Sequence, residues 1–116
     1  MNVQRTPISG DGLASVMRTL ADPTRRLLFE RIVQKGEATV VDLTRDAEVS
    51  QPAVSQHLKA LRAAGLVIER RQGRNAFYRP EPQGLTPLVD WMAVYGSFWR
   101  ERFAALKTLL QETESK

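Results

Sequence analysis

The residues with the clearest chemical potential lie together in one segment, 50–64, which reads SQPAVSQHLKALRAA. The segment carries amide, hydroxyl and basic side chains and no acid. Amides and hydroxyls can hydrogen-bond base edges in the major groove of DNA, and lysine or arginine can neutralise phosphates. A helix that is merely solvated more often carries pairs of glutamate and lysine. The composition of this segment therefore favours contact with a nucleic acid.

A helical wheel divides the same segment into two faces. Val54, Leu58 and Leu61 cluster within about 60° of one another at 100° per residue, so we expect them to face the core. Ser50 is a typical N-cap, and Gly65 is a typical C-terminal residue in the left-handed conformation. Backbone amides at 51–53 suit a phosphate. The face opposite the apolar stripe presents Pro52, Gln56 and Lys59, flanked by Ala53, Ser55 and Arg62.

A second set of basic residues follows in segment 66–80, LVIERRQGRNAFYRP. Two β-prone runs flank a glycine-containing turn at 72–75, which predicts a β-hairpin. Arg70 and Arg71 lie on or beside this hairpin, and Arg74 and Asn75 lie at its tip. Such a hairpin can straddle the DNA backbone or enter the minor groove, where the potential favours arginine. The alternative is a hairpin that arginine only makes soluble.

Positive charge is concentrated in these two segments. Residues 50–80 hold six basic residues and one acid, Glu69, which gives a net charge of +5, while the whole chain of 116 residues has +4. The rest of the chain is therefore close to neutral. This distribution is the footprint expected of a face that binds a polyanion, although a solvated basic surface is the alternative.

The composition argues against sulfur and metal chemistry. The chain has no cysteine, which excludes thiolate catalysis, zinc-finger ligation and sensing through sulfur. Its single histidine, His57, lies just off the apolar face of its helix, where we expect a partly buried, hydrogen-bonded side chain or a phosphate contact rather than a metal ligand. The carboxylates Asp90, Glu101 and Glu112 are too scattered for a zinc site. We expect no metal and no other cofactor.

The rest of the chain supplies the helices that must position these residues. Apolar spacing predicts a first helix over about 11–21, and Asp22-Pro23 is a typical start for a second helix that ends at Gly36. Thr39 and Asp42 resemble a capping box that starts a short third helix through residue 47. We expect the second helix to bury Leu27, Leu28, Ile32 and Val33.

The resulting order is four helices, a hairpin and a final helix that has Thr86 as its cap and Pro87 at its first position. This order predicts a mainly α protein with a small β-hairpin, a winged helix-turn-helix. We expect a flexible N-terminus over 1–10, one domain over 11–112 and a frayed tail over 113–116. No apolar run approaches the length that spans a bilayer and no secretory signal is visible, so we expect a soluble intracellular protein without membrane contact.

The final helix, predicted over 87–112, carries more large apolar residues than one monomer can cover. We expect it to pair with the first helix across the two-fold axis of a homodimer, which would space two recognition helices by about one DNA turn, roughly 34 Å. The alternative is a long core helix folded back on its own domain. Whether a small effector enters the aromatic seam stays open. The candidate dimer-interface residues are Leu13, Met17, Leu88, Trp91, Met92, Tyr95, Phe98, Trp99 and Leu106.

Three successive segments, LADPTRRLLFERI, SQPAVSQHLKALRAAGLV and RRQGRNAFYRP, resemble signatures of the arsenic-repressor-like (ArsR/SmtB) family of bacterial winged-helix regulators. The resemblance covers about residues 13–100. It implies a bacterial, cytoplasmic, nucleoid-associated homodimer that represses transcription from imperfect inverted repeats, often in its own promoter. It also implies that Gln51, Ser55 and Gln56 read DNA and that the wing around 71–74 clamps the backbone.

The resemblance has one departure. Many members of the family bind metals or sense persulfides through cysteine pairs or His/Asp/Glu clusters, and this chain has no cysteine and one histidine. The stretch GSFWRERFAALKTLL resembles a branch with no recognised metal site. The candidate DNA-binding residues are then Ser50, Gln51, Pro52, Ser55, Gln56, Lys59 and Arg62 in the recognition helix and Arg70, Arg71, Arg74 and Asn75 in the wing.

The sequence thus favours a sequence-specific regulator of double-stranded DNA, and three other functions remain to be compared with it. A non-specific nucleoid or RNA-binding protein could use the same basic face. A winged helix can also serve protein contacts alone. An enzyme is disfavoured, because the chain has no glycine-rich phosphate loop, no cysteine nucleophile and no evident charge-relay partner for His57.

Overall fold

The helices and the β-hairpin follow one another along the chain in the order that the sequence predicts. The structure adds two short elements, a two-residue strand after the second helix and a 3-10 turn before the last helix. The computed structural model describes residues 5–114, and side chains from residue 12 onward. The helices are α1 (Arg5–Ala21), α2 (Pro23–Lys35), α3 (Val40–Arg45), α4 (Gln51–Ala63) and α5 (Thr86–Glu114), and the strands are β1 (Ala38–Thr39), β2 (Val67–Gln72) and β3 (Asn75–Pro80). A 3-10 turn, η1 (Pro82–Leu85), joins β3 to α5. The described residues form no helix long and apolar enough to cross a membrane.

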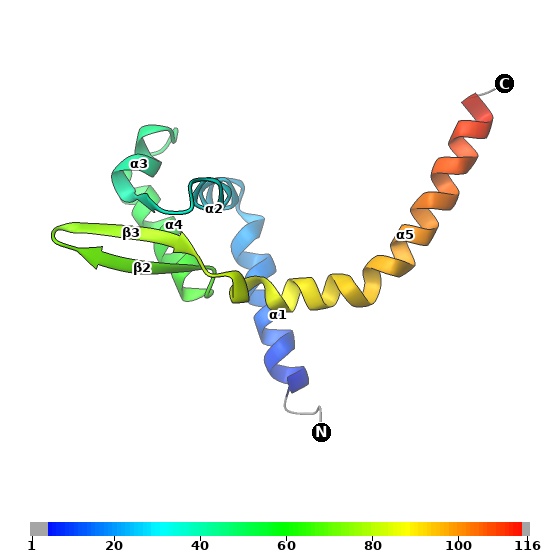
Figure 1. The fold of residues 1–116 in the computed structure, drawn as a ribbon, viewed down its shortest axis with the longest axis horizontal. Coiled ribbons are helices and arrows are strands. Elements are labelled where there is room, and N and C mark those ends of the chain that lie inside the picture. Colours follow the sequence, from blue (N-terminus) through cyan, green and yellow to red (C-terminus); the bar gives the residue numbers. More distant parts are fainter. Residues whose placement is uncertain (1–4, 115–116) are drawn as a thin grey trace.

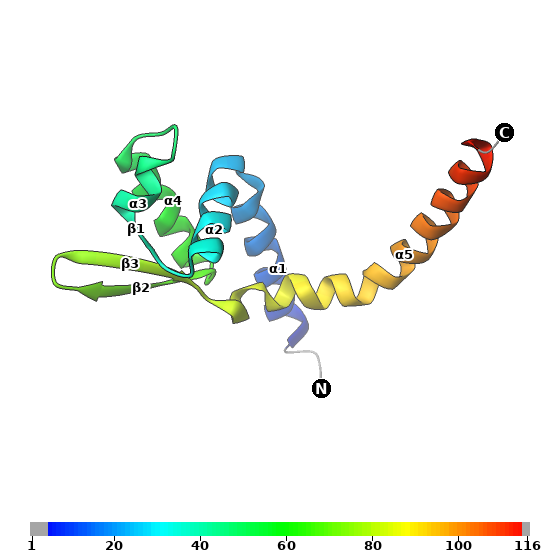
Figure 2. The same cartoon turned by 45° about the horizontal axis from the view of Figure 1, so that its top comes forward.

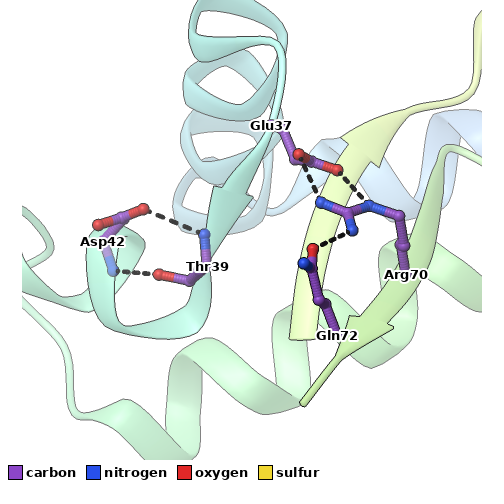
Figure 3. Close-up of polar contacts among 5 residues, drawn as sticks. All are labelled: Glu37, Thr39, Asp42, Arg70 and Gln72. Carbon is purple, nitrogen blue, oxygen red and sulfur yellow. Dashed lines mark hydrogen bonds and ion pairs between the residues drawn. The ribbon is translucent and has the colours of Figure 1, made fainter. Parts of the chain in front are cut away.

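Capping side chains set the starts of the middle helices. The Asp22 carboxylate accepts a hydrogen bond from the Arg25 N–H at 3.0 Å, and the Ser50 hydroxyl accepts one from the Ala53 N–H at 3.3 Å. Thr39 and Asp42 exchange two such bonds, a complete capping box (Figure 3). These groups satisfy backbone donors that have no partner inside the helix. The predicted starts of α2, α3 and α4 are confirmed, although α3 ends at Arg45, two residues early.

The core forms where α4 packs on α2 and α3. Val54, Leu58 and Leu61 have no exposed surface, which confirms the predicted apolar stripe. Other buried apolar side chains come from α1, α2, β1, α3, β2 and the connection after α4, namely Val16, Leu28, Phe29, Ile32, Ala38, Leu43, Leu66 and Val67. Burial of a large aliphatic side chain contributes about 1.5–3 kcal/mol. This stripe therefore fixes the rotation of α4 about its own axis.

The buried face of α2 differs from the prediction. Leu28 and Ile32 are buried as expected, but Leu27 is 44% and Val33 is 48% exposed, and Phe29 is buried instead. At 100° per residue the covered stripe runs from Leu28 to Phe29, with Val33 just beyond one edge and Leu27 well beyond the other. The sequence alone does not show where this stripe is centred, because apolar residues occupy five positions on α2.

The three strands form an antiparallel sheet in the order β1-β3-β2. The predicted hairpin is confirmed, with Glu69 opposite Tyr78 and Arg70 opposite Phe77. Gly73 adopts a φ of 63° at the turn, a conformation that glycine adopts without steric cost. The hairpin projects beyond the helices (Figures 1 and 2). Strand β1 was not predicted, because only two residues, Ala38 and Thr39, pair with β3.

The two long helices differ from the prediction at their ends. Helix α1 begins at Arg5 instead of about residue 11, and it tolerates Pro7 because an N–H in the first turn has no intrahelical partner. Thr86 is not an extended N-cap: its φ and ψ of −53° and −44° are helical, because η1 runs directly into α5. The Glu81 carboxylate caps η1 instead, and accepts a hydrogen bond from the Gln83 N–H at 3.0 Å. Residues 1–4 and 115–116 of the predicted flexible termini lie outside the described residues.

Helix α5 packs on the body only through its beginning. Leu88 is half-buried against the core, and the Pro87 ring lies against Gly12 of α1, where an added Cβ would be 3.1 Å away from it. The rest of α5 leads away from all other elements (Figures 1 and 2), and α5 has no buried residue. The alternative of a core helix folded back on its own domain is therefore wrong.

We predict that Gly84→Ala destabilises the protein by about 3 kcal/mol, at the upper end for overpacking. A methyl group at Gly84 would lie 2.1 Å from the carbonyl oxygen of Gly65 and 3.1 Å from the Cα of Leu66. Backbone cannot move aside as a side chain can, so the exit of the hairpin must separate from the end of α4. Chemical unfolding at equal protein concentration measures the loss. The matched control, Gln83→Ala at the exposed neighbouring position, should stay within about 0.5 kcal/mol of the wild type; equal stability of the two variants would contradict the close approach.

Candidate nucleic-acid interface

The outer face of α4 is a continuous exposed surface without an acid. Every candidate DNA-binding residue of this helix is exposed, namely Ser50, Gln51, Pro52, Ser55, Gln56, Lys59 and Arg62. This face of α4 points outward because the opposite face is buried. Ser50, the exposed N-cap, fixes where the helix begins. It can offer amide and hydroxyl groups to base edges and cations to phosphates.

A groove of about 460 Å³ separates α4 from the hairpin β2–β3. Its lining residues come from both elements, namely Ser55, Lys59, Arg62, Ala63, Glu69, Arg71 and Tyr78. Three cations therefore meet around one acid and two hydroxyl groups. The structure brings together candidate residues of the recognition helix and the wing that are up to 16 positions apart in the sequence.

Glu69 is the centre of this groove. Its carboxylate forms ion pairs with Arg62 and with Arg71, the latter at 3.3 Å, and accepts a hydrogen bond from the Tyr78 hydroxyl at 3.4 Å. Burial, and then the charge of Glu69, raise the pKa of the Tyr78 phenol above its usual value, so this hydroxyl remains a donor at neutral pH. The sequence shows Glu69 only as the single acid of segment 50–80, and its role as a shared partner was not predicted.

Arg70 lies on the other face of the sheet from Arg71, because successive side chains of a strand alternate. Its guanidinium donates to the Glu37 carboxylate at 3.0 and 3.1 Å and to the Gln72 side-chain oxygen at 2.7 Å (Figure 3). It also lies over the Phe77 ring, 4.6 Å from the centroid. The hydrogen bonds from Arg70 hold the pKa of Glu37 below its usual value. The structure therefore does not place Arg70 in the groove, and sequence reasoning missed its partner Glu37.

The tip of the hairpin is the most projecting part of the wing. Arg74 and Asn75 are both exposed there, next to Gly73. Among the described residues no carboxylate forms an ion pair with Arg74. The tip therefore presents an uncompensated positive charge at the end of a narrow two-stranded element.

His57 links α4 to α2. It is half-buried, and its Nδ1 accepts a hydrogen bond from the Arg25 Nε at 3.3 Å. This agrees with the expectation of a partly buried, hydrogen-bonded histidine. Within residues 5–114, no group of three histidine, aspartate or glutamate side chains is placed to hold a metal ion.

Seven of the nine candidate dimer-interface residues lie along α5, and the other two, Leu13 and Met17, lie on α1, which contacts the beginning of α5. Leu13 and Leu88 are half-buried, and the other seven candidates are exposed. Aromatic rings contact one another along α5: the centroids of Trp91 and Tyr95 are 5.2 Å apart, and those of Trp99 and Phe103 are 6.0 Å apart. So large an exposed apolar surface is typical of an interface.

Comparison with known proteins identifies the family. The family model "Bacterial regulatory protein, arsR family" matches residues 22–69, from the N-cap of α2 into β2. An HTH-type transcriptional regulator, Rv2034 of Mycobacterium tuberculosis, is 48% identical over 71 residues, which are 61% of this chain and 65% of that regulator, just under two thirds of its length. The arsenical resistance operon repressor of Escherichia coli is 39% identical over 86 residues, 73% of this chain and 70% of that repressor.

A similar solved structure supports the same family. The ArsR-like transcriptional regulator from Rhodococcus sp. RHA1 superposes with a TM-score of 0.67 at 31% identity, over 85% of this chain and 92% of that chain. The match extends beyond residues 22–69 and includes most of the fold, so that the arrangement of helices and wing is that of a winged helix-turn-helix. This chain belongs to the ArsR family of bacterial regulatory proteins.

Proposed function

We propose that this protein is a DNA-binding transcriptional regulator, a repressor that recognises its operator with α4 and holds the DNA backbone with the wing. The observation that carries the proposal is the acid-free exposed face of α4, which continues into the cationic groove beside β2 and β3. Relatives named as a transcriptional regulator and an operon repressor support it. The family consists of regulators rather than enzymes.

The exposed side chains divide into two roles in this proposal. Gln51, Ser55 and Gln56 present groups that can bond base edges, and a glutamine can bond adenine through two hydrogen bonds. Lys59 and Arg74 present charges that suit phosphates of any sequence. Base contacts would thus come from α4, whereas phosphate contacts would come mainly from the edge of the exposed face of α4 and from the tip of the wing.

A homodimer is the second part of the proposal. The exposed apolar surface of α5 and α1 would be covered by the same surface of a second copy, which gives the two-fold symmetry of an inverted-repeat operator. We also propose that the operator lies in the protein's own promoter. We propose a cytoplasmic, nucleoid-associated location. The aromatic seam offers no polar group that would select a particular effector.

A non-specific nucleic-acid-binding protein is the alternative function. The exposed Lys59, Arg74 and Arg79 favour it, because charges of this kind bind any phosphate backbone. The discriminating experiment is fluorescence anisotropy with a duplex from the gene's own upstream region and a scrambled duplex over a salt series. Binding that is about a thousandfold tighter to the first supports the regulator. Equal, salt-sensitive binding to both, followed by failure to select a preferred site from random DNA, would support the alternative.

We predict that Gln56→Ala and Arg74→Ala weaken DNA binding in different ways. Gln56→Ala removes a base-reading amide, so it should cost about 1–3 kcal/mol at one base pair and relax the preference there. Arg74→Ala removes a phosphate contact, so it should weaken all sequences alike and reduce the slope of log K against log salt by about 1. Anisotropy on operator duplexes with single base-pair changes measures both effects. If the two variants behave alike, the division between reading and holding is wrong.

We also predict that the protein sediments as a dimer at micromolar concentration and that Trp99→Glu makes it a monomer. Trp99 is 50% exposed in the centre of the apolar surface of α5, and a charge there would have to be buried without a partner in the dimer. The matched control is Ser97→Glu, on the opposite side of the same helix. A wild-type mass equal to one 13.1 kDa chain would exclude the dimer, and dissociation of both variants would exclude this face as its interface.

A further inference from the structure

Glu69 is an acid in the middle of a surface that otherwise avoids acids. It is the single acidic residue of segment 50–80, and strand alternation turns it toward α4 together with Arg71. Its side chain is 11% exposed, so the carboxylate is largely withdrawn from water. Carboxylates are buried to this extent only when hydrogen bonds or opposite charges compensate them.

The compensation comes from the same cations that would bind DNA. Glu69 is paired with Arg62 at the end of α4 and with Arg71 on β2, and Tyr78 donates to it from β3. The Arg62 and Arg71 side chains are nevertheless 60% and 72% exposed. Both guanidiniums can therefore meet an approaching phosphate, but their charge is already shared with a carboxylate that repels it.

We propose that Glu69 is an internal counterion that determines DNA specificity: it occupies the groove between α4 and the wing in place of a DNA phosphate, and so keeps the affinity for non-operator DNA low. This inference rests on the proposed function. Phosphate contacts supply binding that is independent of sequence, whereas base contacts supply the preference. A carboxylate that weakens the phosphate contacts and leaves the base contacts unchanged therefore raises the ratio of operator affinity to non-specific affinity.

The position of Glu69 also gives it a structural share in recognition. Its two ion pairs and one hydrogen bond connect α4, β2 and β3, so they hold the recognition helix and the wing at a fixed angle. On an operator this fixed angle places base readers and wing together. On other DNA, arginines without this restraint would reach phosphates in many registers, which strengthens non-specific binding alone.

The test is Glu69→Gln, which removes the charge and keeps the size of the side chain. Anisotropy with a scrambled duplex and with an operator chosen by selection from random DNA, from 50 to 200 mM salt, gives both affinities. We expect binding to scrambled DNA to tighten by about fivefold, the value of one additional phosphate contact near 0.15 M salt, with a slope steeper by about 0.9. Operator binding should change less, so the specificity ratio should fall.

The matched control is Glu37→Gln. This change removes one carboxylate that is paired with Arg70, an arginine of β2 whose side chain lies on the face of the sheet away from α4. It changes the net charge by the same amount, and we expect less than a twofold change in binding to scrambled DNA. An equal effect of both variants would reduce the role of Glu69 to net charge and overturn the inference, as would unchanged or weaker binding of Glu69→Gln to scrambled DNA.

A second comparison keeps the inference testable if Glu69→Gln does not fold. Arg71→Gln removes an arginine that Glu69 already compensates, whereas Arg74→Gln removes one that has no carboxylate partner among the described residues. Arg71→Gln should therefore weaken binding to scrambled DNA clearly less than Arg74→Gln does, and equal losses would overturn the inference. Failure of the wild type to bind any duplex would instead overturn the proposed function itself.

Discussion

The rest of the structure depends on the burial of one apolar stripe on α4. Val54, Leu58 and Leu61 lose all contact with water, and each contributes on the order of 1.5–3 kcal/mol in that position. A rotation of α4 by even one residue, 100°, would expose them. The stripe therefore decides which side chains the helix presents outward, and the amide and hydroxyl groups of Ser55 and Gln56 are exposed as a consequence of packing.

A second constraint links the wing to this helix. Leu66 is fully buried directly after α4, the Glu81 N–H donates to its carbonyl oxygen at 2.9 Å, and Gly84 lies against the backbone of Gly65. Both ends of the hairpin are thus held at the C-terminal end of α4. Strand alternation then sends Glu69 and Arg71 toward α4 and Arg70 away from it. A basic run that looks uniform in the sequence becomes two sets of arginines with different partners.

The features that the sequence predicts are those with local causes. The caps at Asp22, Thr39 and Ser50, the turn at Gly73 and the stripe of α4 each depend on residues a few positions apart, and all were found. The features that it misses depend on partners that are distant in the chain. Strand β1 exists only because β3 is beside it, and Arg70 is held by Glu37 more than 30 positions earlier. Thr86 is a local exception, because it is helical as a consequence of η1 directly before it. The DNA-reading and dimer-interface residues remain predictions.

The charge available to a partner is smaller than the composition suggests. Of the six basic residues in 50–80, three are already paired with carboxylates, Arg62 and Arg71 with Glu69 and Arg70 with Glu37. Within the described residues, Lys59, Arg74 and Arg79 form no such pair. Charge without an ion-pair partner in the described part of the chain is thus located on the exposed side of α4 (Lys59), at the tip of the hairpin (Arg74) and at its base (Arg79, opposite Ile68). Each phosphate contact adds about 0.9 to the salt slope. If the proposed function holds, the small number of unpaired cations predicts a modest salt dependence, with base contacts supplying a larger share of the affinity.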